Sequence, residues 1–153
     1  MNNEPDILTY EQLLESDVPQ RFNSKPKAET FRELYDRAML AGQTAAKACT
    51  PTPMVVGQAK DLFSNEIDMS KSVEVIYSGV CGFAWVKVKP ATSAFAKWLK
   101  AQGICKGTSY TGGYDIRVGD YGQSMERKYA HASAMAKVLQ NSGINCYAES
   151  RMD

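Results

Sequence analysis

The chain has 153 residues, of which 44% are hydrophobic and 23% are charged, and its formal net charge at pH 7 is +1. A chain of this length buries about 70% of its unfolded surface, which is enough for one hydrophobic core. No apolar run approaches the roughly 20 residues that span a bilayer, and the first residues lack the basic and apolar parts of a signal peptide. We therefore expect a cytoplasmic protein without membrane contact.

The charge is unevenly distributed along the chain. Up to Gly79 there are 8 basic and 12 acidic residues, a net charge of −4, whereas from Val80 onward there are 10 basic and 5 acidic residues, a net charge of +5. This asymmetry predicts an anionic partner for the basic part, or cover of the basic part by the acidic part. A chance distribution is the third interpretation.

The four cysteines lie far apart and form no Cys-x-x-Cys pair, so the spacing typical of a zinc site is absent. Disulfides are rare in a reducing compartment, and free cysteines are among the most buried residue types. We expect buried free thiols at Cys49, Cys81, Cys105 and Cys146.

Residues 1–79 are expected to form a helical and irregular acidic segment that packs on the core. Residues 1–26 contain three prolines and one short helical stretch, Tyr10–Glu15, which indicates a partly ordered N-terminal extension. In residues 27–48, apolar side chains recur at i, i+3, i+4, i+7 and i+8. This spacing predicts an amphipathic helix with one apolar stripe, made of Phe31, Leu34, Tyr35, Ala38 and Met39.

The helix should end near Cys49, because Pro51 and Pro53 disfavour helical conformation at the residues before them. Met54–Val56 is a candidate extended segment, and Val73–Tyr77 alternates like an edge strand. Between these two segments the sequence is polar and indefinite, with a candidate helical turn around Leu62 and Phe63.

Signals for regular structure are stronger after Val80. A strand through Trp85 stops at Pro90, and Thr92 or Ser93 can cap a helix that ends at Gly103. Two extended stretches follow, residues 106–111 and 114–119. They are joined by Gly112 and Gly113, a pair typical of a two-residue hairpin turn.

A second helix should start at Ser124 and end at Gly143, followed by a strand over Ile144–Ser150. We predict its core stripe to be Met125, Tyr129, Ala132, Ala136 and Leu139. The order strand, helix, strand, strand, helix, strand over residues 80–153 is that of an α+β, ferredoxin-like βαββαβ domain. In that arrangement the first and third strands lie in the middle of the sheet, both helices cover one face, and the other face is open.

Strand alternation predicts which side chains lie on the open face. If Ile116 and Val118 face the helices, Arg117 points outward, and the same argument places Tyr147 outward. The predicted ligand-binding residues on this face are Phe83, Trp85, Lys87, Arg117 and Tyr147, with Asp115 and Glu149 beside them.

Aromatic side chains with neighbouring cations on a sheet stack the bases of single-stranded nucleic acid. Gly82–Val88 is also similar in part to the RNP1 motif of RRM domains. An RRM carries RNP1 on its third strand and not its first, so the similarity is one of chemistry. The alternatives are that helix 27–48 or a second copy of the chain covers this face, or that it binds another ligand.

Catalytic motifs are weak in this sequence. His131 is the only histidine, and we expect it to be a partly exposed helix residue that neither catalyses nor binds metal. The loop Gly119–Ser124 precedes a helix but lacks a P-loop signature, which favours a plain turn and cap over a phosphate site. We predict a protein without enzymatic activity, metal or cofactor.

Several segments together resemble a family of small proteins encoded by tailed bacteriophages. The resemblance covers roughly residues 48–153 and is carried by Pro51–Val56, Val80–Val86, Ala94–Leu99, Gln123–Lys128, Ala134–Leu139 and Tyr147–Asp153. It brings no activity, cofactor or catalytic residue. It implies expression inside an infected bacterial cell, with a role in phage DNA metabolism or in disabling host machinery.

These observations predict a non-enzymatic accessory protein that binds single-stranded nucleic acid through the aromatic and basic sheet face. The alternative is a host-directed inhibitor, such as an anti-defence or host-takeover factor, that acts on a bacterial protein by direct contact. A homodimer is compatible with both hypotheses.

Overall fold

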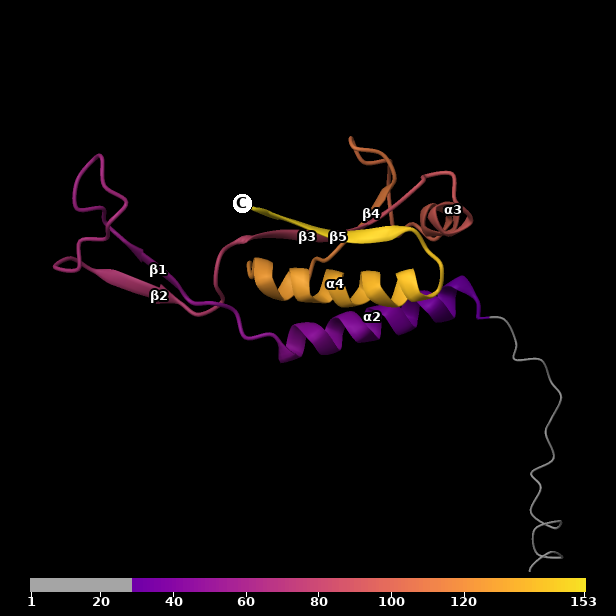
Figure 1. Ribbon diagram of the computed structural model, residues 1–153, viewed down its shortest axis with the longest axis horizontal. Helices are drawn as coiled ribbons and strands as arrows, with labels where there is room; N and C mark the ends of the chain where they lie inside the picture. The colour runs from indigo at the N-terminus through magenta and orange to yellow at the C-terminus, as the bar shows by residue number, and fades with distance from the viewer. Residues whose placement is uncertain (1–28) are drawn as a thin grey trace, which may run out of the picture.

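The computed structural model describes residues 29–153, so the partly ordered extension expected at residues 1–26 lies outside the described part. Within the described residues there are three helices and two antiparallel sheets, and the protein belongs to the α+β class. One sheet has three strands and packs with the helices to form the body of the protein. The other is a two-stranded ribbon that projects from it (Figure 1).

The first described helix, α2 (Phe31–Ala48), confirms the helix expected over residues 27–48 and starts slightly later. Thr30 caps it, because the Thr30 hydroxyl accepts from the Glu33 backbone N–H while the Glu33 carboxylate accepts from the Thr30 N–H. The helix ends at Cys49, whose extended backbone leads into Pro51.

The body continues with β3 (Gly82–Val88), α3 (Ala94–Ala101), β4 (Tyr114–Arg117), α4 (Met125–Asn141) and β5 (Cys146–Met152). The strand order is β4-β3-β5, and both pairs are antiparallel. The expected helix caps are confirmed at Ser93 and Ser124, and Gly103 and Gly143 follow the two helices with positive φ.

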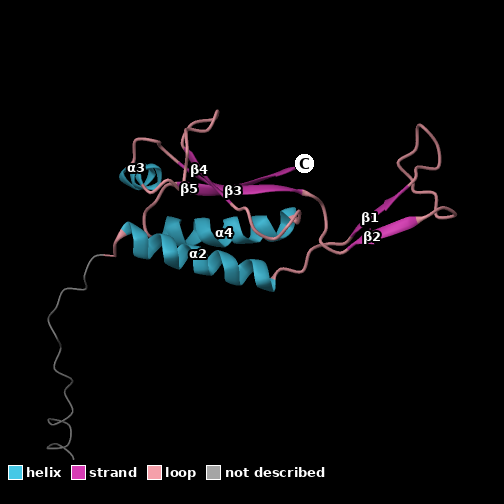
Figure 2. Ribbon diagram, turned by 180° about the vertical axis from the view of Figure 1, so that it is seen from behind, coloured by secondary structure: helices cyan, strands magenta, loops and turns pink. Residues whose placement is uncertain are grey.

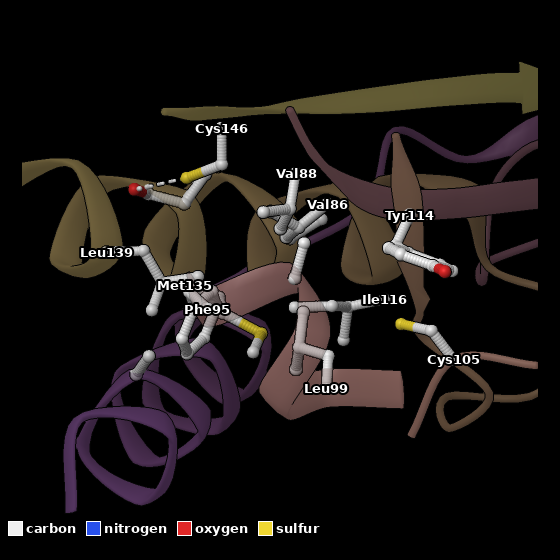
Figure 3. Packing of buried hydrophobic residues seen from close by; sticks show 14 of the residues in the cluster. Val86, Val88, Phe95, Leu99, Cys105, Tyr114, Ile116, Met135, Leu139 and Cys146 are labelled. Atoms are coloured by element: carbon white, nitrogen blue, oxygen red, sulfur yellow. Dashed lines mark hydrogen bonds between the residues drawn. The ribbon is translucent and has the colours of Figure 1, made fainter. Parts of the chain in front are cut away.

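The core lies on the helix side of the sheet. Helix α4 packs between β3 and β5 on one side and α2 on the other, and Figures 1 and 2 show these successive layers. Val86 and Val88 of β3 point into this core and are fully buried, together with Phe95, Leu99, Met135 and Leu139 of the helices (Figure 3). Helix α2 joins α3 through aromatic contacts of Phe31 with Phe95 and Trp98.

The second strand expected in the sheet, residues 106–111, does not form. Thr108 makes one isolated bridge to Tyr114, and the chain then turns, with Ser109 and Gly113 joined by a backbone hydrogen bond of 2.9 Å. Gly112 and Gly113 take positive φ, as the turn requires. The segment offers no apolar residues at alternate positions, so a strand there would bury nothing. As a result the expected third strand, β4, lies at the edge of the sheet and not in its middle.

The buried side of α4 differs from the predicted stripe. Ala132, Ala136 and Leu139 are buried as expected, but Tyr129 is 44% exposed. The helix instead buries Lys128, His131 and Met135. The reason is that α4 contacts the sheet and α2 at once, so its buried surface is wider than a single stripe and is rotated from the predicted one.

His131 is therefore not the partly exposed residue that we expected, since it is 1% exposed. Its Nδ1 lies 2.9 Å from the Tyr121 hydroxyl. On the other side α2 approaches closely at Gly42, where a Cβ would lie 2.5 Å from the imidazole ring. Gly42 thus allows the two helices to pack around the histidine, and burial lowers the pKa of His131, with Asp120 opposing this shift.

The second sheet joins β1 (Met54–Gly57) to β2 (Val73–Ile76), in the two segments for which the sequence indicates extended structure. Ile67 from the connecting loop packs against Gly57, where a Cβ would lie 2.5 Å from the Ile67 Cγ2. We call residues 54–77 the arm. It extends away from the helices and the main sheet (Figure 2).

We predict that His131 makes the protein less stable as the pH falls from 7 to 5. The unfolded chain binds a proton at His131 near a pKa of about 6.5, whereas the folded protein holds the ring neutral to a lower pH because the pKa is depressed. The unfolded state therefore binds more protons in this window, and the free energy of unfolding decreases as the pH falls.

Urea denaturation at several pH values tests this, with His131→Gln as the comparison. The variant should be less stable at pH 7 but should show a shallower pH dependence between 7 and 5, because His131 is the only histidine. Parallel pH profiles of the two proteins would show that His131 does not titrate as described.

Candidate nucleic-acid interface

The register of the main sheet brings all five predicted binding residues onto one face. Trp85 pairs with Arg117 of β4 and with Glu149 of β5. Two residues further along, and so on the same face, Lys87 lies opposite Asp115 and Tyr147. The partners at each level therefore share a face, as strand alternation predicts.

This face is opposite the helices. Helix α2 packs on α4 and α3 and contributes Leu34 and Ala38 to the core on the helix side. The alternative in which helix 27–48 covers Phe83 and Trp85 is therefore wrong. Among the described residues the face has no helical cover, and Phe83 is 40% exposed.

Lys87 is buried at the centre of this face, with 1% of its side chain exposed. Its ammonium lies 2.7 Å from the Asp115 carboxylate, 2.7 Å from the Ser109 hydroxyl and 3.8 Å from Glu149. Burial of an ammonium is tolerated only when it is paired and hydrogen-bonded. Lys87 is thus on the predicted face, but its charge is already compensated inside the protein.

The indole of Trp85 is held by the same network. Its Nε1 donates to Glu149 Oε2 at 2.7 Å, and this carboxylate also faces Lys87. The hydrogen bond fixes the half-buried ring on the sheet. Asp115 and Glu149 are both occupied by Lys87 and Trp85, so they add little uncompensated negative charge to the face.

A groove of about 640 Å³ opens on this face beside Phe83 and Trp85. It is bordered by three cationic side chains, Arg117, Lys128 and Arg151, and by the loop that carries Tyr110. The Lys128 ammonium lies 5.5 Å from the Phe83 ring and the Arg151 guanidinium 5.7 Å from it, both within the range of a cation–π interaction. Within residues 29–153, none of these three cations forms an ion pair.

Two of the three cations that border the groove, Arg151 and Lys128, were not among the residues predicted from the sequence. Arg151 follows Tyr147 and Glu149 in the same alternation and lies opposite Phe83, so extending the last strand beyond Ser150 would have found it. Lys128 comes from α4, and its ammonium reaches the Gly82 carbonyl at 3.0 Å. No strand pattern could have found it.

Tyr147 lies away from the groove. Tyr147 is 38% exposed, and the Lys89 ammonium lies 5.9 Å from the centre of its ring. Three predicted residues, Phe83, Trp85 and Arg117, thus line the groove, and Lys87 lies directly beside it, paired with the lining residue Asp115. The fifth shares the face but does not line the groove.

The cysteines, which are the remaining candidate reactive groups, do not form a reactive or metal-binding site among the described residues. All four cysteines are free, with Cys105 and Cys146 buried as expected but Cys49 and Cys81 only half-buried. Burial raises the pKa of Cys105 and of Cys146 to about 11, so both thiols are protonated at neutral pH. In the described part of the chain, no group of three or more His, Cys, Asp or Glu side chains could hold a metal ion.

The loop Gly119–Ser124 is a turn and a cap. The Met125 N–H donates to the Val80 carbonyl at 3.0 Å, and the Ser124 hydroxyl accepts from the Arg127 N–H. These contacts use N–H groups at the start of α4 that a phosphate would need. No helix among the described residues is long and apolar enough to cross a membrane.

Comparisons of the chain with models of protein families, with curated proteins and with solved structures give no match.

We predict that Lys87 and Asp115 are energetically coupled. Lys87→Met leaves the Asp115 carboxylate without its ion pair and should lower the free energy of unfolding by about 1–3 kcal/mol. The double variant with Asp115→Asn should lose less than the sum of the two single losses, with a coupling of about 0.5–3 kcal/mol.

Urea denaturation of the four proteins gives this coupling. Lys97→Met, at an exposed position of α3, is the matched control and should change stability by no more than about 0.5 kcal/mol. Strictly additive losses from Lys87→Met and Asp115→Asn would contradict a coupled pair.

Proposed function

We propose that this protein is a non-enzymatic accessory protein that binds single-stranded nucleic acid in the groove beside Phe83 and Trp85. The observation that carries the proposal is the combination of an aromatic floor with three cations that have no ion-pair partner among the described residues. A base can stack on an aromatic ring while the neighbouring phosphates meet the cations.

The size of the groove sets the expected affinity. Two rings, one of them half-buried, offer stacking for one or two bases, each contributing about 1–3 kcal/mol. Lys128 is buried and donates to the Gly82 carbonyl, so the phosphate contacts come from the exposed Arg117 and Arg151. Two such contacts would give a slope of log affinity against log salt of about −1.4 for a single strand. Binding should therefore be modest, sensitive to salt and tolerant of sequence.

The fold supports this role in outline. We propose that the body is a ferredoxin-like βαββαβ domain without its second strand, a reading supported by the strand order β4-β3-β5 and by the position of α4 behind the sheet. We propose that the irregular loop at residues 106–111 replaces this strand so that Thr108, Ser109 and Tyr110 can form one wall of the groove.

The resemblance to proteins of tailed bacteriophages gives this function a setting. In the cytoplasm of an infected bacterium, single-stranded nucleic acid is produced wherever phage DNA is copied or repaired. The alternative is a host-directed inhibitor that acts by contact with a bacterial protein. The exposed apolar side chains of the arm, such as Leu62 and Phe63, favour this second function.

We predict that a fluorescently labelled single-stranded oligonucleotide binds this protein at low salt. Phe83→Ala should weaken binding about 5- to 150-fold, the equivalent of one stacked base, and Phe83→Tyr should restore most of it. Arg117→Ala should weaken binding and also reduce the salt slope by about 0.7, because one phosphate contact is lost.

Fluorescence anisotropy at several salt concentrations measures both quantities. Lys137→Ala is the control for Arg117→Ala, since Lys137 is exposed on α4 and does not line the groove. If the wild-type protein does not bind at low salt, or if Phe83→Ala binds as the wild type does, the proposal fails.

A further inference from the structure

The arm is the largest feature of the structure that the proposed function leaves unexplained. Among the described residues, β1 and β2 pair only with each other. At the tip of the arm, Leu62 is 96% exposed and Phe63 is 99% exposed. A two-stranded hairpin is marginally stable by itself in water, and a cluster of exposed apolar side chains marks an interaction site.

The strands of the arm are apolar on both faces. Val55 lies opposite Val75 on one face and Met54 lies opposite Ile76 on the other. Val55 and Val75 are 46% and 43% exposed. A ribbon that packed one face on its own body would have one polar and one apolar face, so this ribbon is suited to contact with another molecule.

The tip combines an aromatic ring with a carboxylate. Asp61 Oδ1 accepts from the Phe63 backbone N–H at 2.8 Å, which holds the carboxylate beside the exposed ring. The arm has two lysines and four carboxylates, a net charge of −2. Both lysines pair within the arm, Lys60 with Glu66 and Lys71 with Asp68, and Asp61 forms no ion pair in the described part of the chain.

The groove described above has the complementary chemistry. It offers aromatic surface at Phe83 and Trp85 and positive charge at Arg117, Lys128 and Arg151. No arm residue lines the groove of its own chain, and the arm extends away from the body beyond the start of β3 (Figures 1 and 2). The arm can therefore meet such a groove only on another copy of the chain.

We propose that the tip of the arm, Asp61–Phe63, docks in the aromatic and basic groove of a second copy of this chain. The Phe63 ring lies against Phe83, and the Asp61 carboxylate meets Arg117. Reciprocal docking of two arms gives a closed two-fold dimer, in which each copy provides one arm and one groove.

This dimer would also regulate nucleic-acid binding, a consequence that rests on the proposed function. A ring with a nearby carboxylate presents the same two features as a base with its phosphate. The arm and the nucleic acid then compete for one groove, and the groove is closed in the dimer until nucleic acid displaces the arm.

Sedimentation velocity over a range of concentrations, without nucleic acid, tests the dimer. The wild-type protein should dimerise, and Phe63→Ser and Arg117→Glu should each weaken dimerisation at least tenfold. Both positions are exposed, so the variants keep the fold. A mixture of the two variants retains one intact arm and one intact groove, and should form heterodimers more tightly than either variant forms dimers alone.

Leu40→Ser is the control, because Leu40 is 64% exposed on α2 and lies outside both surfaces. A wild-type protein that stays monomeric up to about 1 mM would overturn the proposal. So would a dimer that Phe63→Ser leaves intact. A dimer that is weakened by Phe63→Ser but not by Arg117→Glu would also overturn it, because the arm would then dock elsewhere.

An oligonucleotide titration of Phe63→Ser separates this proposal from the proposed function. If both hold, the variant binds nucleic acid more tightly than the wild type at concentrations where the wild type is dimeric. Equal binding by the two proteins contradicts the regulation by the arm but keeps the nucleic-acid site. Absence of binding contradicts the nucleic-acid site and leaves the sedimentation result to decide on the dimer.

Discussion

The ammonium of Lys87 is the group on which the open face of the sheet depends. It lies on the central strand, is 1% exposed, and faces Asp115 on one neighbouring strand and Glu149 on the other. A buried charge of this kind is costly without its partners, and its pairing favours one strand register over a shifted one. A shift by one residue in either strand pair would move the ammonium and its carboxylates to opposite faces.

The same network determines the charge and shape of the groove. Asp115 pairs with Lys87, and Glu149 accepts from the Trp85 indole. These carboxylates therefore do not neutralise the positive charge of the cations that surround the groove. The Ser109 hydroxyl accepts from the Lys87 ammonium and lies 3.1 Å from the Thr111 hydroxyl. The polar network thus connects the sheet to the loop that walls the groove, and the stability of the fold and the geometry of the site have a common origin.

The helices show how much of the fold could be predicted from the sequence. Local signals located the helices and their caps correctly, because capping residues, prolines and glycines act over a few residues. The missing second strand and the rotated face of α4 could not be found in this way. The loop that replaces the strand is held by a tertiary hydrogen bond from Lys87 to Ser109. The rotated face of α4 depends on the close approach of α2 at Gly42, which buries His131. Hydrophobic periodicity did not indicate that a lysine and a histidine would be buried in α4.

The site was predictable to the extent that strand alternation governs it. Alternation placed Phe83, Trp85, Lys87, Arg117 and Tyr147 on one face, which the register reproduces. It could not show that Lys87 would be buried by its cross-strand partners, or that Lys128 would reach the groove from a helix. These outcomes depend on side-chain length and on where β4 ends, and the alternation of side chains along a strand indicates neither.

Mapping of an oligonucleotide on the protein by NMR chemical-shift perturbation tests the central claim most directly. The account predicts the largest shifts at Phe83, Trp85, Arg117 and Arg151, with smaller changes at Tyr147 on the same face and none on the exposed side of α2. Perturbation confined to the arm or to the helical layer, or an unchanged spectrum at saturating oligonucleotide, would contradict the assignment of this groove as the binding site.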